Sequence, residues 1–448
     1  MICTSVILAA GQGKRMNSNL PKVLHSIAGL SLIEWALDAG SEASGRKPVI
    51  VVGPDAHQVR EKIGERAVLV EQAERLGTGH AVQQAEEALR GKSDLVLVTY
   101  ADMPLLTADT LRKLIKLQER EQGALSMLTV LADDPRGFGR ILRDENDQVA
   151  AIVEEVDATP EQREIRELNP GVYCFNADWL WDHLPQLKKS AVGEFYLTDL
   201  VAMAVDEGKK AAAYISEFPE ELIGVNTRVH LAEAEQAMRR RINKIWMESG
   251  VTLVDPDRTY IGADVAIGRD TILAPGCVLE GNTLIGENSL LGPETFIRDS
   301  KIGNGCAIRY SVVESAVVED DVDIGPFGHL RKGAHLKQGV HMGNFGEVKN
   351  STLERGVKMG HFSYIGDADI KEDVNIGAGT VTCNFDGEHK HKTEVGAGAF
   401  IGSGTMLVAP VRVGQESVTG AGSVVTSEVA DKSVVVGVPA RELKKKSD

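Results

Sequence analysis

The first residues whose types and spacing suggest chemistry lie close to the N-terminus. Residues 8–16, Leu-Ala-Ala-Gly-Gln-Gly-Lys-Arg-Met, leave an apolar run and enter a loop with two glycines, and Pro21 and Lys22 follow. Backbone N–H groups of a glycine loop can approach phosphates closely, and Arg15 and Lys22 can balance the charge of a triphosphate. A dinucleotide-binding loop would need a third glycine where Met16 stands, and a Walker loop needs Gly-Lys-Ser/Thr. The segment therefore predicts a phosphate-binding loop of another kind.

A second group of polar residues lies between Arg331 and Lys392. Lys349 follows Arg331 by three units of six residues, and a stack of such units would place the two cations one strand spacing, ~4.8 Å, apart. Two cations so close repel each other unless an anion lies between them, and a sugar phosphate suits that place. The alternative is two surface side chains that point away from each other.

The elements that must position the first group follow an alternating pattern. Short β-branched runs at residues 5–9, 49–52, 67–71 and 95–100 predict strands, and residues 32–41, 55–63 and 80–89 predict helices between them. Such alternation predicts an α/β domain with a mostly parallel sheet that is covered on both faces. Residues 227–249 predict a connecting helix, in which Arg239, Arg240 and Arg241 form a solvated face.

Beyond about residue 250 a different period sets in. Aliphatic residues recur at every sixth position with occasional slips, and small residues often follow them. A fixed six-residue period predicts a parallel β-helix in which each unit supplies one short strand and a turn, and three units make one triangular coil. A sandwich of many short strands would not keep phase over so long a stretch. The positions predicted to point inward are Ile261, Ile267, Leu273, Leu279, Ile285, Leu291, Ile297, Ile302, Ile308, Ile324, Leu330, Leu336, Ile365, Ile370, Ile376, Val395, Ile401, Leu407, Val413, Thr419 and Val425.

With these motifs, the N-terminal half resembles the sugar-1-phosphate nucleotidyltransferases. The resemblance includes the glycine loop, Gln72-Ala73-Glu74 with 76–80 Leu-Gly-Thr-Gly-His, and the strand end 100–104 Tyr-Ala-Asp-Met-Pro. It implies a Rossmann-like fold and uridylyl transfer from UTP to a sugar phosphate. It also implies Mg²⁺ held by Asp102 and Asn226; the alternative for Asp102 alone is a helix cap or turn. The implied nucleotide- and sugar-binding residues are Leu8, Ala9, Ala10, Gly11, Arg15, Lys22, Gln72, Gly77, Thr78, Tyr100, Gly139, Glu154, Asn169, Tyr196, Thr198 and Asn226.

Together with the repeats, residues 1 to about 440 are similar to the bacterial bifunctional N-acetylglucosamine-1-phosphate uridyltransferases/glucosamine-1-phosphate acetyltransferases. This resemblance implies a left-handed β-helix that uses acetyl-CoA, with His361 as general base. It implies sugar-phosphate contacts from Arg331, Lys349, Tyr364, Asn375 and Lys390, and acetyl-CoA contacts from Ala378, Asn384, Phe385, Ser403 and Ala421. Two positions depart from the family pattern. Phe385 stands where many relatives have tyrosine, so one hydroxyl contact is lost, and Gly437 lies near a position where some relatives place arginine.

Residues 382–387, Thr-Cys-Asn-Phe-Asp-Gly, interrupt the six-residue phase and predict a loop that leaves the β-helix. The expected organisation is a uridylyltransferase domain at 1–226, a linker helix at 227–249, an acetyltransferase β-helix at 250–438 and a tail at 439–448.

Composition excludes several other classes of protein. A net charge of −16 argues against a nucleic-acid partner, whose phosphates demand clustered Lys and Arg. The five cysteines are widely spaced and odd in number, which favours a reducing cytoplasm over a disulfide framework. No stretch approaches the ~20 apolar residues of a membrane span, so a cytoplasmic protein without a membrane partner is expected. The expected partners are the small-molecule substrates and further copies of the chain.

Three alternatives remain at this stage. The chain could be a single-activity sugar-1-phosphate nucleotidyltransferase with a structural β-helix. The β-helix could serve only in oligomerisation, and since such prisms usually associate as trimers, a homotrimer is expected in either case. Third, the chain could bind zinc, because the β-helix scaffold is shared with zinc-dependent carbonic anhydrases that gather histidines between subunits. The candidate ligands are His329, His335 and His341, which are six residues apart. A step of six residues moves one face around the prism, however, so these three should point apart.

Overall fold

The computed structural model describes residues 1–190 and 193–443. Contacts divide the chain into two compact units, Met1–Met238 and Arg239–Asp448, and the division falls inside helix α9 (Arg228–Glu248). The expected domain limits, residues 226 and 250, lie on either side of that point. Of the expected tail, Arg441–Glu442 form strand β43, and residues 444–448 lie outside the described residues.

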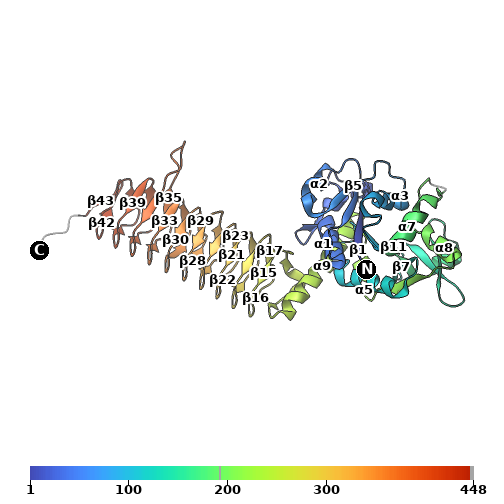
Figure 1. Cartoon of the computed structure of the whole chain (residues 1–448). Coiled ribbons are helices and arrows are strands. Elements are labelled where there is room, and N and C mark those ends of the chain that lie inside the picture. The colour runs from blue at the N-terminus through green and yellow to red at the C-terminus, as the bar shows by residue number, and fades with distance from the viewer. Residues whose placement is uncertain (191–192, 444–448) are drawn as a thin grey trace. The chain divides into compact units, whose positions relative to one another are not determined.

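The first unit is built on a ten-stranded sheet within the described residues, in the order β5-β4-β1-β6-β11-β7-β10-β8-β9, with β12 beside β7. Successive residues of β1 face opposite sides: Val6 and Leu8 pack into one core cluster and Ile7 into another, so helices cover both faces (Figure 1). The strands are β1 (Cys3–Ala9), β4 (Val49–Val52), β5 (Val68–Glu71), β6 (Leu95–Tyr100), β7 (Leu125–Leu131), β8 (Gly139–Arg143), β9 (Val149–Val153), β10 (Glu167–Asn169), β11 (Tyr173–Asn176) and β12 (Ala211–Ile215), with a small hairpin of β2 (Ser26–Ile27) and β3 (Leu30–Ser31).

The expectation of a mostly parallel sheet is wrong for the second half of this sheet. Strands β5, β4, β1 and β6 run parallel, but β11 is antiparallel to both β6 and β7, and β10, β8 and β9 continue antiparallel. For β8 and β9 the reason is the length of the connection. Only a few residues separate these two strands, and a short connection joins antiparallel neighbours, whereas a parallel pair needs a long crossover.

The helices agree with the expected positions except at residues 80–89. That segment breaks into α3 (Thr78–Gln83) and α4 (Glu86–Leu89), because the amides of Gln84 and Ala85 bond three residues back, to Ala81 and Val82, and so tighten the turn. Helix α1 begins where the Ser31 N–H donates to the Glu34 carboxylate at 2.9 Å. The remaining helices are α1 (Leu32–Ser44), α2 (His57–Ile63), α5 (Ala108–Glu121), α6 (Pro160–Arg163), α7 (Ala177–His183) and α8 (Asp199–Asp206), with 3₁₀ turns η1 (Lys14–Met16), η2 (Lys22–Leu24), η3 (Gly64–Arg66), η4 (Leu184–Gln186), η5 (Pro219–Leu222) and, in the second unit, η6 (Pro256–Arg258).

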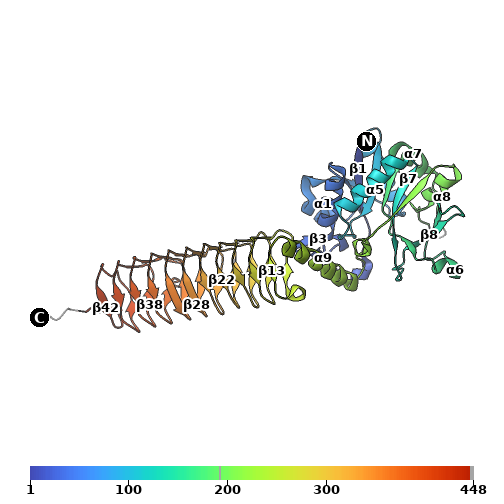
Figure 2. The same ribbon diagram turned by 90° about the horizontal axis from the view of Figure 1, so that it is seen from below.

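The second unit is the expected left-handed parallel β-helix. From β13 to β41 every third strand belongs to the same sheet, so the strands stack coil upon coil in three sheets (Figure 2). The first sheet holds β13 (Thr252–Leu253), β16 (Ile272–Leu273), β19 (Leu290–Leu291), β22 (Ala307–Ile308), β25 (Asp323–Ile324), β28 (His341–Asn344), β31 (Lys358–His361), β34 (Asn375–Ile376), β37 (Phe400–Ile401), β40 (Val418–Thr419), β42 (Val434–Val436) and β43. The second holds β14 (Tyr260–Ile261), β17 (Val278–Glu280), β20 (Phe296–Arg298), β23 (Val312–Glu314), β26 (His329–Leu330), β29 (Glu347–Lys349), β32 (Tyr364–Gly366), β35 (Val381–Cys383), β38 (Met406–Val408) and β41 (Val424–Val425). The third holds β15 (Ala266–Ile267), β18 (Leu284–Ile285), β21 (Lys301–Ile302), β24 (Val317–Val318), β27 (His335–Leu336), β30 (Thr352–Leu353), β33 (Ala368–Ile370), β36 (Thr393–Val395) and β39 (Val411–Val413).

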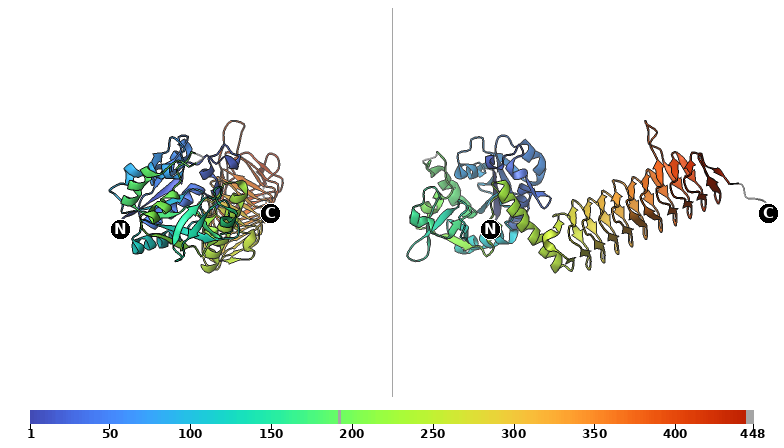
Figure 3. Two further views of the ribbon diagram at one scale, coloured as in Figure 1. Left: turned by 90° about the vertical axis from the view of Figure 1, so that its right-hand side faces the viewer. Right: turned by 180° about the vertical axis from the view of Figure 1, so that it is seen from behind.

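The side chains predicted to point inward are confirmed as the core of this prism, since every one of them is buried. Parallel pairing aligns them coil upon coil, as in Ile376 beside Ile401 and Ile401 beside Thr419. The expected loop is present, but it begins later than predicted, because Thr382 and Cys383 still belong to β35. Residues 384–392 leave the prism between β35 and β36 as a projecting loop (Figure 3).

Candidate active sites

The glycine loop and Asp102 meet because of the strand order in the first unit. Strands β1 and β6 are parallel neighbours in register, with Leu8 beside Tyr100, so the residues after each strand emerge at the same edge of the sheet. Gly13 has φ of 62°, and a Cβ there would lie 2.5 Å from the Lys22 Cβ. The loop therefore folds back onto Lys22 through a position that only glycine fits.

A cavity of about 500 Å³ lies over this edge. The structure brings most of the expected nucleotide-binding residues together there. Arg15 is exposed in η1 and does not line this cavity or the two beside it, whereas Lys14 does. The lining residues are Leu8, Ala9, Ala10, Gly11, Gln12, Lys14, Lys22, Val23, Gln72, Arg75, Gly77, Thr78, Ala81, Tyr100, Asp102 and Glu194.

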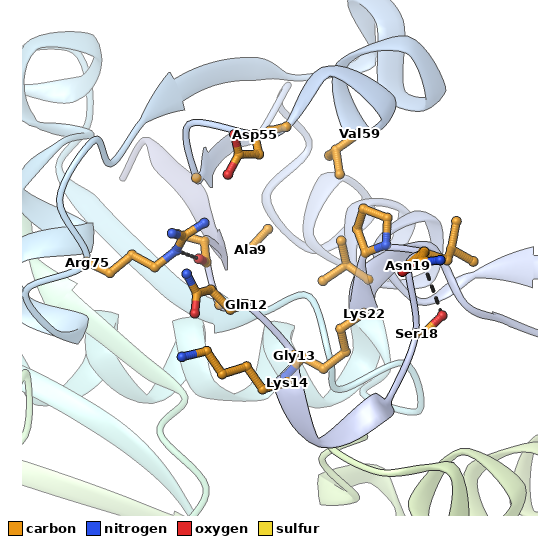
Figure 4. Close-up of a pocket in the computed structure, with 17 residues that line it drawn as sticks. Ala9, Gln12, Gly13, Lys14, Ser18, Asn19, Lys22, Asp55, Val59 and Arg75 are labelled. Atoms are coloured by element: carbon orange, nitrogen blue, oxygen red, sulfur yellow. Dashed lines mark hydrogen bonds between the residues drawn. The ribbon is translucent and has the colours of Figure 1, made fainter.

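Arg75 is a cation of this site that the sequence reasoning missed. Its Nε donates to the Ala10 carbonyl at 2.7 Å, and a Cβ on Gly53 would lie 2.5 Å from its Nη2. Figure 4 shows Arg75, Gln12 and Lys14 along one side of the loop. Arg75 stands between the two segments that carried the resemblance, so its place in the sequence was the available signal.

The two expected metal ligands lie around one cation. The Lys22 Nζ donates to Asp102 Oδ2 at 2.5 Å and to Asn226 Oδ1 at 3.0 Å. Asn226 reaches this point because the Val225 N–H donates to the Asp102 carbonyl at 2.8 Å. A carboxylate oxygen and an amide oxygen that converge on a positive group are a donor set that suits Mg²⁺. The residues therefore fit the expected metal, with the other coordination positions open to phosphates and water.

A second cavity of about 400 Å³ continues from the first and shares Thr78, Tyr100, Asp102 and Glu194 with it. The two are joined by pairing of residues 76–79 with 195–197, in which the Leu197 N–H donates to Thr78 Oγ1 at 3.0 Å. All of the expected sugar-binding residues line it. They are Gly139, Glu154, Asn169, Tyr196, Thr198 and Asn226.

Burial shapes the electrostatics of this second cavity. Desolvation raises the pKa of Glu154, against the hydrogen bond it accepts from Thr198 Oγ1 at 2.9 Å. Burial also raises the pKa of Tyr100, with Asp102 and Glu154 nearby. The Asn169 amide donates to the Tyr173 hydroxyl at 2.7 Å, while its Oδ1 accepts from the Gly171 N–H at 3.1 Å. Both sides of the Asn169 amide are thus fixed at the cavity wall.

Arg140 is the largest charged side chain that is fully buried, at 1% exposed. Its Nη1 contacts Glu155 Oε2 at 2.6 Å and donates to the Phe138 carbonyl. Phe138, Gly139 and Glu155 line the sugar-side cavity. Arg140 therefore joins the Phe138 and Glu155 walls of this cavity from behind.

In the β-helix, His361 ends strand β31 and is exposed. Its Nδ1 lies 3.0 Å from Asn344 Oδ1, its register partner on the neighbouring strand β28. An amide oxygen can only accept, so Nδ1 carries the proton and Nε2 keeps a free lone pair. In this tautomer the imidazole can accept a proton at Nε2.

Three of the five expected acetyl-CoA residues, Ala378, Ser403 and Ala421, lie in line with His361, whereas Asn384 and Phe385 lie in the projecting loop. Met359 pairs with Ile376, Ile376 with Ile401, and Ile401 with Thr419, so the residue two places after each occupies the same corner of successive coils. Two backbone bonds support this alignment: Gly404 N–H to the Ala378 carbonyl and Gly422 N–H to the Ser403 carbonyl. We call the resulting row the histidine column. It consists of Asn344, His361, Ala378, Ser403 and Ala421.

The expected pairing of Arg331 with Lys349 is present in the register. Leu330 aligns with Val348, and the Arg331 N–H donates to the Val348 carbonyl, so the two cations occupy the same position of adjacent coils. Lys390 also lies close to Lys349, and the positive charges of Lys390 and Arg331 lower the pKa of Lys349. Glu347 partly offsets this charge through an ion pair with Arg331 at 2.8 Å. The cluster can therefore hold an anion.

Hydrogen bonds fix the projecting loop both to the prism and within the loop itself. Asn384 donates to Asp367 Oδ2 at 2.5 Å, and Phe385 pairs with Lys390 across the loop. Asp386 accepts from the Glu388 and His389 amides and bonds His391, contacts that lower its pKa. The Phe385 side chain is exposed, Tyr364 lies in β32 and Asn375 in β34.

The three histidines of the zinc alternative do point apart. His329, His335 and His341 belong to three different sheets, and each pairs with its own carboxylate. Among the described residues, no group of three or more His, Cys, Asp or Glu is placed to hold a metal ion. Nor does any described helix have the length and apolarity to cross a membrane.

Comparison with known proteins covers both units. Residues 5–189 match the model of the MobA-like NTP transferase domain. A putative glucose-1-phosphate thymidylyltransferase of Bacillus anthracis is similar in structure, with 19% identity, a TM-score of 0.44, and 52% of this chain and 94% of that chain covered. The bifunctional protein GlmU of Heliobacterium modesticaldum is 44% identical over 434 residues, which cover 97% of this chain and 95% of that protein. That of Caldanaerobacter subterraneus is 45% identical over 433 residues, covering 96% and 94%. The chain therefore belongs to the family of the bifunctional protein GlmU.

Proposed function

We propose that the chain makes UDP-N-acetylglucosamine in two steps at two sites. The β-helix transfers an acetyl group from acetyl-CoA to glucosamine-1-phosphate, and the first unit transfers a uridylyl group from UTP to the product, releasing pyrophosphate. The single observation that carries the proposal is the presence of two separate constellations in one chain. One is a glycine loop with Asp102 and Asn226, and the other is the histidine column beside Arg331, Lys349 and Lys390.

In the first unit the phosphate oxygen of the sugar attacks the α-phosphorus of UTP in line, and the bond to pyrophosphate breaks. The loop amides, Lys14 and Arg75 face the nucleotide phosphates, while Asn169 and Glu154 orient the sugar. Asp102 and Asn226 would hold Mg²⁺, which would neutralise part of the phosphate charge. Catalysis consists of positioning and charge stabilisation without a covalent intermediate.

In the second unit the amine of glucosamine-1-phosphate attacks the thioester. His361 Nε2 removes the proton that the ammonium must lose, and Asn344 holds the ring in the required tautomer. Arg331, Lys349 and Lys390 bind the sugar phosphate. The small side chains Ala378, Ser403 and Ala421 leave an unobstructed edge along which the cofactor can lie.

The test is incubation of the protein with glucosamine-1-phosphate, acetyl-CoA, UTP and Mg²⁺, followed by detection of UDP-N-acetylglucosamine and free thiol. Omission of acetyl-CoA should abolish the product, and N-acetylglucosamine-1-phosphate should restore it. Product formation from the acetylated sugar alone, with no thiol released from acetyl-CoA, would support the single-activity alternative instead.

Replacing Arg140 with methionine is expected to raise the KM for N-acetylglucosamine-1-phosphate by about 10-fold and leave the KM for UTP unchanged. The reason is that Arg140 joins Phe138 and Glu155, which line the sugar-side cavity and not the nucleotide-side cavity. Steady-state kinetics with each substrate varied separately provides the measurement. Arg143→Met on the same strand, whose side chain pairs with Glu167, is the control. A parallel rise of both constants would contradict this role.

We further propose that copies of the chain associate side by side through the β-helix as a homotrimer. Tyr310, Phe327, Phe345 and Phe362 form an exposed aromatic row on successive coils, with ring centroids 5.8 and 5.0 Å apart for the first two steps. The first three have φ of 47°, 63° and 55°, where aromatic residues are strained. Strained and exposed apolar side chains in a row indicate a contact surface. Phe362 follows His361, so a neighbouring copy would border the acetyl-transfer site.

Phe345→Asp is therefore expected to shift the protein from trimer to monomer at micromolar concentration. A carboxylate in the middle of the aromatic row would have to be buried without a partner. Light scattering coupled to size exclusion measures the mass. The matched control is Leu284→Asp, which alters an exposed apolar side chain in β18, outside the aromatic row. An unchanged mass for Phe345→Asp would exclude this surface.

A further inference from the structure

The contacts of Lys22 differ from those expected of a phosphate-binding lysine. Its ammonium lies between Asp102 Oδ2, at 2.5 Å, and Asn226 Oδ1, at 3.0 Å, which are the two oxygens assigned to the divalent cation. The pair is well shielded from water, with side chains 10% and 18% exposed for Lys22 and Asp102. Removing one partner of such a pair leaves the other charge uncompensated in a poorly hydrated place, so Asp102 needs a cation at this position.

A lysine ammonium and a divalent cation cannot share these two oxygens. Mg²⁺ binds oxygen at ~2.0–2.1 Å and demands a near-octahedral shell. An ammonium that stays within hydrogen-bonding distance of the same oxygens would fall within a few ångströms of the metal, where like charges repel strongly at low local dielectric. Occupation by one therefore excludes the other.

The surroundings give the Lys22 side chain a second place to go. Lys22 lines the nucleotide-side cavity of about 500 Å³ and also a neighbouring cavity of about 400 Å³ that shares the glycine loop and is lined by Ser18, Asn19 and Asp55 as well. Lys14 and Arg75 line both as well, so this region already attracts anions. The lysine backbone is fixed by Pro21 before it and by Gly13 against its Cβ, and only the end of the side chain has to turn.

We propose that Lys22 is an internal placeholder for the metal. In the free enzyme its ammonium neutralises Asp102 and orients Asn226. When nucleotide and metal arrive together, the ammonium moves to the phosphates and gives the two oxygens to the metal. This inference rests on the proposed function of the first unit. It implies that the nucleotide-free enzyme binds divalent cations weakly, and that nucleotide and metal binding are coupled.

The experiment measures Mn²⁺ binding to the full-length, nucleotide-free protein by the loss of the free-ion signal in electron paramagnetic resonance. Lys22→Met is expected to bind Mn²⁺ more tightly than the unchanged protein, on the order of 10- to 100-fold, because a charge-assisted hydrogen-bonded competitor has been removed. Lys22→Gln, which keeps a polar side chain without the charge, is a second variant with the same expected direction. The matched control is Lys14→Met, which removes a cation from the same loop that makes no contact with Asp102, and no change is expected.

The double variant Lys22→Met/Asp102→Ala shows which site responds, because the gain should vanish when the carboxylate is removed. Equal Mn²⁺ affinity in the unchanged protein and in both Lys22 variants overturns the proposal. If uridylyl transfer is present in that case, the proposed function stands and only the placeholder role fails. Tighter binding in the Lys22 variants, with no uridylyl transfer by the unchanged protein, would instead support the exchange and reject the proposed function.

Discussion

His361→Ala is expected to lower acetyl transfer by ~10²–10⁴-fold and to leave uridylyl transfer unchanged. The substrate amine is an ammonium at neutral pH and cannot attack a thioester until it loses a proton. The Asn344 amide oxygen accepts from His361 Nδ1 at 3.0 Å, which leaves Nε2 as the proton acceptor. Alanine removes the acceptor, and the register of β31 in the prism stays the same because the core position Met359 is untouched.

Two assays on the same sample check this result. Thiol release from acetyl-CoA follows acetyl transfer, and pyrophosphate release with N-acetylglucosamine-1-phosphate and UTP follows uridylyl transfer. His341→Ala is the matched control, since His341 is an exposed histidine on the preceding strand of the same sheet and pairs with Asp323. Loss of both activities in His361→Ala, or of neither, would show that the base lies elsewhere.

The repeat could be predicted in detail because its physical cause is local. Each coil must place one aliphatic side chain inward per face, so the requirement recurs along the chain and is visible as a period. The spacing of Arg331 and Lys349 followed from the same rule, and the structure has them in register. The loop was visible as a long break in the period, but its bounds were not, since the predicted residues 382–387 include two residues of β35 and the loop covers residues 384–392.

The histidine column could not be obtained from spacing. The separations between His361, Ala378, Ser403 and Ala421 are unequal, because a loop and shortened turns intervene. These residues were proposed from a family resemblance, and only the strand register brings them onto one edge. The resemblance supplied residue identities, and pairing in the sheet explains why those residues can act together.

In the first unit the limits were different. The parallel half of the sheet followed from alternation, but the antiparallel half contains the β8–β9 hairpin and β11, which lies between β6 and β7. Arg75 and Arg140 act through backbone carbonyls and buried contacts that leave no sequence pattern. The contacts of Lys22 join residues that are 80 and 204 positions apart, and such distant pairs depend on the complete fold.

Asp102→Ala is expected to lower uridylyl transfer by at least ~10²–10³-fold while acetyl transfer continues at its normal rate. The carboxylate is the only full negative charge among the two expected metal ligands, so its removal leaves Asn226 as a single neutral oxygen. It also frees Lys22, whose ammonium then remains on Asn226 or on the phosphates. Both effects act on the same step, because an unneutralised triphosphate resists attack by an anionic sugar phosphate.

The measurement is pyrophosphate release over a range of Mg²⁺ concentrations, since a weakened metal site gives partial recovery at high Mg²⁺ and a lost structural contact does not. Asp55→Ala is the matched control, because Asp55 is an exposed carboxylate that lines the neighbouring cavity. Unchanged uridylyl transfer in Asp102→Ala would remove the metal assignment, and the lysine exchange with it. Acetyl transfer should stay unchanged in Asp102→Ala, because the proposed β-helix site contains none of these residues. The first reaction requires neutralisation of phosphate charge, whereas the second requires removal of a proton from an ammonium.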